Sequence, residues 1–229
     1  PITCGYRMEG NSFEFSVQLR LDELAIVIDP VLLFSSYLGG SENDQAYDVE
    51  VDRRGNVYVA GQTMSSDFPN VGFPITIVNW DMFITKLEPR GRDFIYSTFI
   101  GGQYDEHASS IKVHTKGDLL VGGQTSSYDI PLYRPVQISR EGPTEGILLR
   151  INDRGNLIRF CTYFGGSVTD TIADVGFDSV GNAYFCGHTC SPDLPLKNSF
   201  HDFTGLECAS FLVKMPPFGD SLISCTYVG

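Results

Sequence analysis

The chain has 229 residues, of which 42% are hydrophobic and 19% are charged, and this balance excludes an intrinsically disordered polymer. Its formal net charge of −12 argues against nucleic acid as a partner, and no apolar run reaches the length of a membrane span. The 24 Gly, 12 Pro, 16 Phe and 11 Tyr residues favour an all-β protein with many turns.

The first 30 residues do not belong to the repeats that follow. Tyr6-Arg7-Met8 and Phe13-Glu14-Phe15 alternate on either side of Glu9-Gly10-Asn11-Ser12, which predicts a β-hairpin. A further strand is predicted over Leu24–Ile28. Because this segment is too short for a domain, residues 1–30 are expected to be the end of a preceding β domain.

Residues 31–229 contain three phrases that recur in a fixed order. The first phrase ends in Gly-Gly, and its apolar residue recurs at Leu38, Ile100, Phe164 and Val228, in steps of 62, 64 and 64 positions. This regular spacing predicts three copies of one structural unit. The glycines of the first phrase are Gly39, Gly40, Gly101, Gly102, Gly165 and Gly166.

The second phrase is a Gly-Asn or Gly-Asp turn that leads into a strand, and the third is Asp-x-Pro. The Asp of the third phrase is expected to accept hydrogen bonds from backbone N–H groups and fix its turn, because a catalytic residue would be needed only once. The turn residues are Gly55 and Asn56, Gly117 and Asp118, and Gly181 and Asn182. The Asp-x-Pro residues are Asp67 and Pro69, Asp129 and Pro131, and Asp193 and Pro195.

Each copy is predicted to hold four strands. In the first copy they cover Ala46–Asp52, Asn56–Thr63, Asp81–Glu88 and Asp93–Phe99, with glycine in the first and third turns, where a hairpin needs positive φ. Four antiparallel strands without helical periodicity are typical of a β-propeller blade. The predicted fold is therefore all-β, with blades over residues 41–102, 103–166 and 167–229.

Three blades are expected to form an incomplete ring, because natural propellers close with four to eight. Residues 31–40 read as a fourth, outer strand without a blade of its own, and the last Gly-Gly phrase is cut at Gly229. We therefore expect a piece of a longer protein, whose partial propeller over residues 31–229 needs further blades from the same or another chain.

Three stretches of the first copy resemble the bacterial SBBP-type β-propeller repeat. They are Tyr37–Ser41, Asp52–Gly61 and Ser65–Pro69, and the resemblance extends over about residues 31–229. It implies an extracellular or cell-surface protein, often multidomain, and it brings no catalytic motif. The second copy departs from the pattern at His114–Gly117, which replaces an acidic turn and is interpreted as variation in a surface loop.

Two groups of side chains could hold a metal ion. Acidic residues that include Asp44 and Asp48 follow the first Gly-Gly phrase, and oxygen-rich loops suit Ca²⁺, although the EF-hand spacing is absent. Cys186, His188 and Cys190 alternate along a predicted strand and could face one side together. Acidic turns and core cysteines explain both patterns without a metal, so we expect no bound metal or cofactor.

The six cysteines leave their pairing open. Cys161 and Cys225 occupy equivalent positions of adjacent blades, too far apart for a disulfide, and are expected to be buried thiols. A bridge between Cys190 and Cys208 would close one loop, but spacing alone cannot decide it. Unpaired cysteines would also suit an intracellular assembly, whereas the resemblance favours an extracellular or cell-surface location.

The sequence contains no nucleophile elbow, P-loop or zinc-protease motif, so an enzyme is not expected. Trp80 could stack on a sugar, but it is expected to fill its own loop. The first interpretation is a non-catalytic scaffold or protein-interaction module of a larger extracellular, surface or filamentous assembly. The alternatives are a carbohydrate- or Ca²⁺-dependent adhesion module and a propeller-type lyase or glycosidase.

Overall fold

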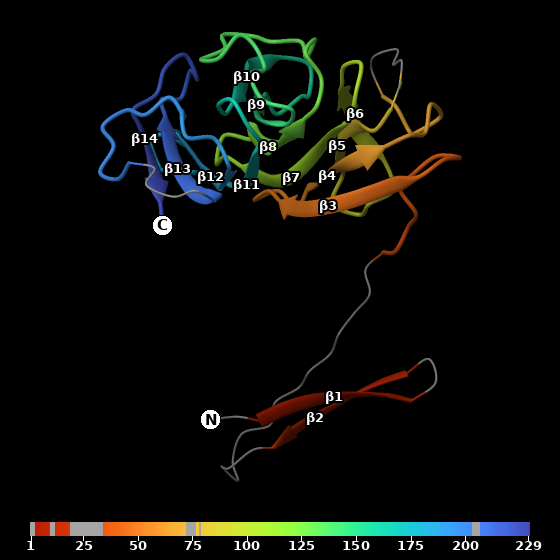
Figure 1. Cartoon of the computed structure of the whole chain (residues 1–229). Helices are drawn as coiled ribbons and strands as arrows, with labels where there is room; N and C mark the ends of the chain where they lie inside the picture. The colour runs from red at the N-terminus through yellow and green to blue at the C-terminus, as the bar shows by residue number, and fades with distance from the viewer. Residues whose placement is uncertain (1–2, 10–11, 19–33, 72–76, 78, 203–206) are drawn as a thin grey trace. The chain divides into compact units, whose positions relative to one another are not determined.

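The computed structural model describes residues 3–9, 12–18, 34–71, 77, 79–202 and 207–229. The regular secondary structure of these residues consists of fourteen strands, which form one two-stranded sheet and three four-stranded sheets (Figure 1). The described part of the chain holds no helix that is long and apolar enough to cross a membrane. The predicted all-β fold with three antiparallel blades that do not close into a ring is confirmed.

The chain divides into two compact units, Pro1–Ser35 and Ser36–Gly229. In the first unit, β1 (Thr3–Glu9) pairs antiparallel with β2 (Ser12–Gln18), and Glu9 lies opposite Ser12. This pairing agrees with the predicted hairpin. The strand predicted over Leu24–Ile28 and the predicted domain boundary at residue 30 lie outside the described residues.

The second unit contains the three four-stranded sheets. In blade 1 the strand bounds differ from the predicted bounds by no more than two residues. Blade 1 consists of β3 (Asp44–Val51), β4 (Val57–Thr63), β5 (Asp81–Leu87) and β6 (Phe94–Ile100). Blade 2 consists of β7 (Glu106–Val113), β8 (Leu119–Thr125), β9 (Glu145–Ile151) and β10 (Ile158–Phe164). Blade 3 consists of β11 (Asp170–Phe177), β12 (Ala183–Thr189), β13 (Ala209–Met215) and β14 (Ser224–Val228).

Each blade is an antiparallel meander in which sequential strands are neighbours. The first strands β3, β7 and β11 contact one another from blade to blade, so they are the inner strands and β6, β10 and β14 are the outer ones (Figure 1). A β-bulge interrupts the pairing near the start of each inner strand, between Ala46 and Asp48, Ala108 and Ser110, and Ile172 and Asp174.

Glycine closes the first turn of each blade in the left-handed region of φ. Gly55, Gly117 and Gly181 have φ values of 83°, 93° and 96°. A side chain with a Cβ atom is disfavoured at such φ values, so the recurrence of glycine has a backbone cause.

The hydrophobic core lies between blades. One cluster joins Met82 and Ile84 of blade 1 to Ile111 of blade 2, and another joins Leu148 of blade 2 to Ile172 of blade 3. Blade 2 therefore buries one sheet face against blade 1 and the other against blade 3, as propeller blades do.

Residues 34–40 are not part of a strand, in contrast to the outer strand predicted over residues 31–40. Tyr37 is fully exposed. An outer strand requires the third strand of its own blade as a hydrogen-bonding neighbour, and none of the three described sheets offers a free third strand for this segment. Residues 31–33 lie outside the described residues.

Candidate interaction surfaces

The Asp-x-Pro phrase clamps the chain segment that enters each blade. Asp67 Oδ1 accepts the backbone N–H of Ser41 at 2.8 Å, and a Cβ atom on Gly40 would overlap with this carboxylate. The Asp therefore accepts a backbone hydrogen bond, as predicted, and the donor Ser41 directly follows the Gly-Gly phrase. The equivalent bonds run from Gln103 to Asp129 at 3.0 Å and from Ser167 to Asp193 at 2.9 Å.

An acidic residue begins each inner strand and holds the same segment from the other side. Asp44 accepts the N–H of Gly40 at 2.7 Å, and Asp48 accepts the N–H of Ile111 in blade 2 at 2.8 Å. The two acidic metal candidates thus serve protein donors. The bonds equivalent to that of Asp44 join Gly102 to Glu106 and Gly166 to Asp170, both at 2.8 Å.

Two fully buried carboxyl side chains, Glu145 and Asp170, lie at the junction of blades 2 and 3, and both would overlap with a Cβ atom on Gly165. Glu145 Oε1 accepts hydrogen bonds from the Gln137 side chain at 2.9 Å and from the backbone N–H of Glu141 at 3.0 Å. Among the described residues, Glu145 Oε2 and Asp170 Oδ1 have no hydrogen-bond partner. Burial and the neighbouring Asp170 charge raise the pKa of Glu145.

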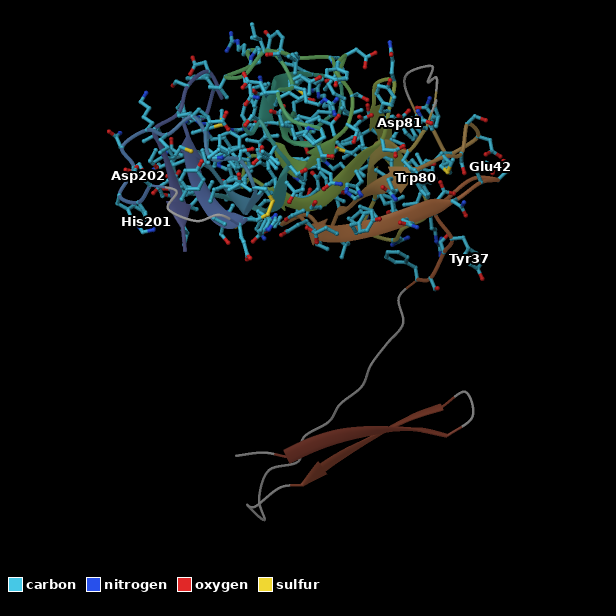
Figure 2. All side chains as sticks on the ribbon, viewed as in Figure 1. Tyr37, Glu42, Trp80, Asp81, His201 and Asp202 are labelled. Carbon is cyan, nitrogen blue, oxygen red and sulfur yellow. A yellow bond between two sulfur atoms is a disulfide. The ribbon has the colours of Figure 1, made fainter. Side chains whose placement is uncertain are left out.

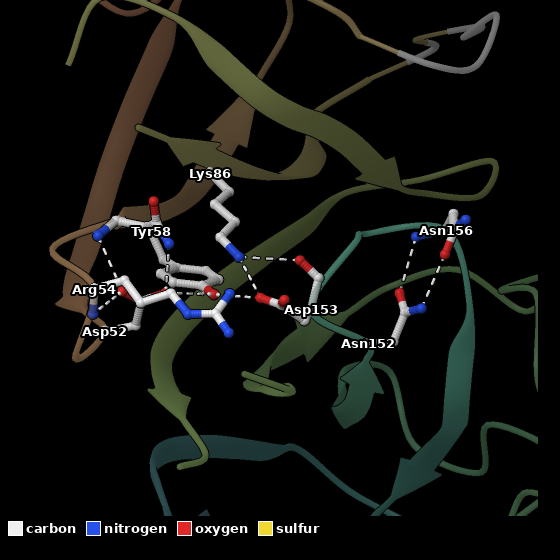
Figure 3. A network of polar contacts seen from close by, with 8 residues as sticks. Asp52, Arg54, Tyr58, Lys86, Asn152, Asp153 and Asn156 are labelled. Carbon is white, nitrogen blue, oxygen red and sulfur yellow. Dashed lines mark hydrogen bonds and ion pairs between the residues drawn. The ribbon is translucent and has the colours of Figure 1, made fainter. Parts of the chain in front are cut away.

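A buried cation on the third strand of blade 1 connects that blade to blade 2 (Figure 3). Lys86 Nζ donates to the backbone carbonyl of Asp153 at 3.0 Å and forms an ion pair with the Asp153 carboxylate. It also lies over the ring of Tyr58, 4.8 Å from the centroid. Asp52 accepts hydrogen bonds from the side chain of Asn56 at 2.7 Å and from the Tyr58 hydroxyl at 3.4 Å.

Arg150 makes the equivalent connection between blades 2 and 3. Its guanidinium donates to the backbone carbonyl of Pro217 at 3.1 Å, and Pro217 occupies the turn position that Asp153 occupies in blade 2. It also pairs with Asp118 at 3.0 Å and lies over the ring of Phe177. Each junction is therefore fastened by one strand-three cation that reaches a turn carbonyl of the following blade.

The interpretation of His114 as part of a surface loop is wrong, because His114 is only 5% exposed and packs against Phe177. It occupies the position of Asp52 in blade 1, and Asp118 occupies the position of Asn56. The carboxylate of blade 2 thus stands four residues later than that of blade 1, and it pairs with the strand-three cation Arg150. Burial and the Arg150 charge lower the pKa of His114.

Comparison with protein-family models adds an independent observation to this geometry. A model described as a beta-propeller repeat, SBBP, matches residues 33–69. The chain carries an SBBP-type β-propeller repeat. Within the matched residues lie the first Gly-Gly phrase, the bulged inner strand β3 and the clamp residue Asp67. A search of curated proteins finds no match to the chain.

Blade 1, which contains this SBBP-type repeat, has one sheet face packed against blade 2. Its other sheet face is not covered by any blade of the second unit. Val49 on β3 is 59% exposed, whereas the equivalent residues Ile111 and Val175 are 2% and 5% exposed because the preceding blade covers them. Val51 on the same strand is 56% exposed. Blade 1 therefore presents an apolar inner-strand face, defined by Val49 and Val51, without the blade that covers it elsewhere.

Blade 3 packs one sheet face against blade 2, and its other sheet face is also uncovered in the second unit. Leu212 on β13 is 42% exposed, whereas Ile84 and Leu148 at the same position are fully buried. Val228 is 43% exposed, whereas its counterpart Phe164 is 1% exposed. The second unit thus ends in two sheet faces whose counterparts form the core of the inter-blade junctions.

Lys214 is the strand-three cation of blade 3 and has no following blade within the second unit. Its Nζ lies 3.6 Å from Asp178 and over the ring of Tyr184, both in its own blade. The carboxyl of Asp178 has its pKa lowered to about 2, by the side chain of Asn182 and by neighbouring backbone N–H groups. Lys214, Asp178 and Tyr184 thus repeat the cation, carboxylate and tyrosine of blade 1. Asp153, which binds Lys86 from the following blade, has no counterpart for Lys214 among the described residues of the second unit.

The cysteine set predicted as a metal half-site contains a disulfide. Cys190 is bonded to Cys208, so its sulfur is not a thiolate ligand, although His188 lies beside this bridge. Cys186 is a free thiol outside the group that could hold a metal among the described residues. The bridge joins the end of β12 to the start of β13 and closes the loop between them.

Cys161 and Cys225 are free and buried, as expected, and burial raises the pKa of each thiol to about 12. Such thiols are poor nucleophiles, because they remain protonated at neutral pH.

Trp80 and Asp81 lie at the start of β5, and the Trp80 carbonyl accepts the N–H of Glu106 at 2.6 Å (Figure 2). The backbone of Trp80 therefore takes part in the junction of blades 1 and 2.

Proposed function

We propose that the chain is a non-catalytic β-propeller module that binds protein, and that further four-stranded blades cover its two end faces. The observation that carries this proposal is the exposure of Val49 and Leu212 at positions that are buried in the other blades. A contiguous exposed apolar face is typical of a protein contact surface.

The occupant that best fits each face is another blade of the same repeat type. A blade that followed blade 3 would bring a strand-three-to-four turn, and Lys214 would donate to its carbonyl as Lys86 does to Asp153. Blade 1 offers such a turn, in which Pro89 occupies the position of Asp153 and is exposed. Blade 1 of a second copy is therefore complementary to blade 3.

Two copies joined in this way, head to tail at both ends, would form a closed ring. Three blades from each of two copies would make a ring of six, which lies within the range of about four to eight blades that closed propellers use. Both uncovered faces would then be buried, and a heterologous contact that closes leaves no open edge for further growth.

The buried chemistry supports a non-catalytic role. The carboxylate pair of Glu145 and Asp170 is fully buried, so a substrate has no access to it in this structure. Asp44, Asp67 and their equivalents hold the same loops in each blade. These acidic groups therefore have structural tasks that explain their presence.

We further propose that the protein works outside the cell or at the cell surface, within a larger assembly. The support is the disulfide between Cys190 and Cys208, because such bonds persist mainly in oxidising compartments. The SBBP-type repeat has the same implication.

Sedimentation of the chain over a range of concentrations tests the proposal. We expect a species of twice the 25.3 kDa chain mass, and we expect Leu212→Lys to weaken association by at least about tenfold, because an ammonium would have to be buried in the contact. Ile138→Lys is the matched control, since Ile138 is 78% exposed in a connecting segment of blade 2.

A wild-type chain that stays at 25.3 kDa at every concentration would contradict the proposal. Equal loss of association in Leu212→Lys and Ile138→Lys would also contradict it, because the contact would then not involve the end face of blade 3.

A further inference from the structure

A groove of about 500 Å³ runs between blades 2 and 3 on the side of the hairpin turns. It is formed by the first turns of both blades, the start of β10, the third turn of blade 3 and the segment around Arg134. A groove of this volume falls within the range of about 300–1,000 Å³ of ligand sites in proteins. Both blades that form it belong to the second unit, so it exists whether or not further blades cover the end faces.

The charged residues that line the groove are mainly basic, in a chain with a net charge of −12. Arg150 and Asp118 neutralise each other at 3.0 Å. Lys116, Arg134 and Arg159 remain, and all three are exposed. Arg159 Nε lies 3.6 Å from Asp118, which Arg150 already engages from both Nε and Nη2, so Arg159 retains capacity for an anion.

Apolar side chains stand beside these cations. Val180 is 74% exposed, Phe218 is 65% exposed and Leu157 is 48% exposed, and all three line the groove. Exposed apolar groups next to cations suit a ligand that carries both carboxylates and hydrocarbon side chains. A sugar acid offers the carboxylates without the hydrocarbon side chains, and a nucleic acid would be repelled by the acidic remainder of the chain.

His114 adds a buried polar group to the lining of the groove. Its Nδ1 accepts the backbone N–H of Lys116 at 3.3 Å, so the neutral ring carries its proton on Nε2. The Nε2 atom is buried and has no hydrogen-bond partner in the described part of the chain. A buried polar atom without a partner thus lies in a residue of the groove wall, beside the three exposed cations.

We propose that this groove binds an acidic peptide segment of a partner protein. Its carboxylates contact Lys116, Arg134 and Arg159, and an apolar side chain of the peptide rests on Val180, Phe218 and Leu157. Charge complementarity selects the ligand and the apolar contacts hold it.

Fluorescence anisotropy tests the proposal with a labelled hexapeptide of alternating Glu and Leu. We expect saturable binding that weakens as salt is added, because the contacts are exposed ion pairs. The double variant Arg134→Gln with Arg159→Gln should weaken binding by at least about tenfold, since it removes two of the three cations. Both residues are exposed, so thermal unfolding of this variant should match that of the wild type.

The matched control is Arg90→Gln with Arg92→Gln, which makes the same charge change on an exposed turn of blade 1 and should leave binding unchanged. A peptide with Gln in place of Glu should not bind. Equal binding by both double variants would overturn the proposal. Binding of oligogalacturonate without binding of the peptide would also overturn it and assign the groove to an acidic sugar.

Discussion

At the scale of single residues, Glu145 is a buried carboxyl whose ionisation is coupled to the fold, and it lies beside the buried side chain of Asp170. Both are fully buried next to Gly165, and each keeps one oxygen without a hydrogen-bond partner among the described residues. Because the pKa of Glu145 is raised, the stability that it contributes is complete below its unfolded value of about 4.5. That contribution is lost as the pH rises through the higher folded value.

Glu145→Gln should therefore stabilise the protein increasingly as the pH rises above about 4.5, because the amide cannot ionise beside Asp170. We expect a gain of about 1 kcal/mol at pH 8 and no gain at pH 4.5, measured as free energy of unfolding in urea. Glu42→Gln is the control, because Glu42 is exposed and should behave as wild type at both pH values. A constant difference between Glu145→Gln and wild type at all pH values would contradict the prediction.

The roles of several residues could be predicted from the sequence. Asp67 accepts backbone hydrogen bonds as expected, since recurrence in each blade marked it as structural. The burial of His114 could not be predicted, because its partner Phe177 lies in the next blade. A signal was nonetheless present, since His114 and Asp118 exchange the acidic position relative to Asp52 and Asn56.

At the scale of elements, the strand-three cations Lys86 and Arg150 connect neighbouring blades. Lys86 is 2% exposed, and it satisfies the Asp153 carboxylate and the Asp153 carbonyl at the junction of blades 1 and 2. Lys214 occupies the same position in blade 3 and reaches only its own blade. Comparison of Lys86 with Lys214 therefore separates the effect of the cross-blade contact on stability from the effect of the lysine side chain within its own blade.

Lys86→Met should lower the free energy of unfolding by about 2 kcal/mol, because it leaves a partly buried carboxylate without its cation. Lys214→Met should change it by less than about 0.5 kcal/mol in the dissociated chain, since its ion pair is longer and more exposed. Urea unfolding at low protein concentration measures both. Equal losses in the two variants would show that the cross-blade contact carries no stability of its own.

Strands were predictable as elements, whereas the bulges were not. The Gly turns and the repeated apolar phrases delimit each strand, and the bounds of β3–β6 agree closely with the prediction. The residues at the three inner-strand bulges, Tyr47, Ser109 and Ala173, share no residue type, so no local sequence signal identifies them. The Cys190–Cys208 bridge was one of several open alternatives, because spacing along a chain does not determine the distance across a loop.

At the scale of the whole molecule, the position of the hydrophobic core determines which surfaces of the module need a partner. Its two buried clusters lie between neighbouring blades, so a set of three blades encloses two junctions and leaves two faces without cover. Repeat units that bury their cores against neighbours need a terminal cap or a closed ring. The apolar inner-strand face of blade 1 and the face of blade 3 around Leu212 are the two surfaces that a closed ring would cover.

The most direct test of this account is to count the blades of the protein in solution by single-particle electron cryomicroscopy. We predict closed rings with more than three blades, in which blade 1 and blade 3 each contact another blade through the faces of Val49 and Leu212. Particles with three blades and both faces open to solvent would contradict the account.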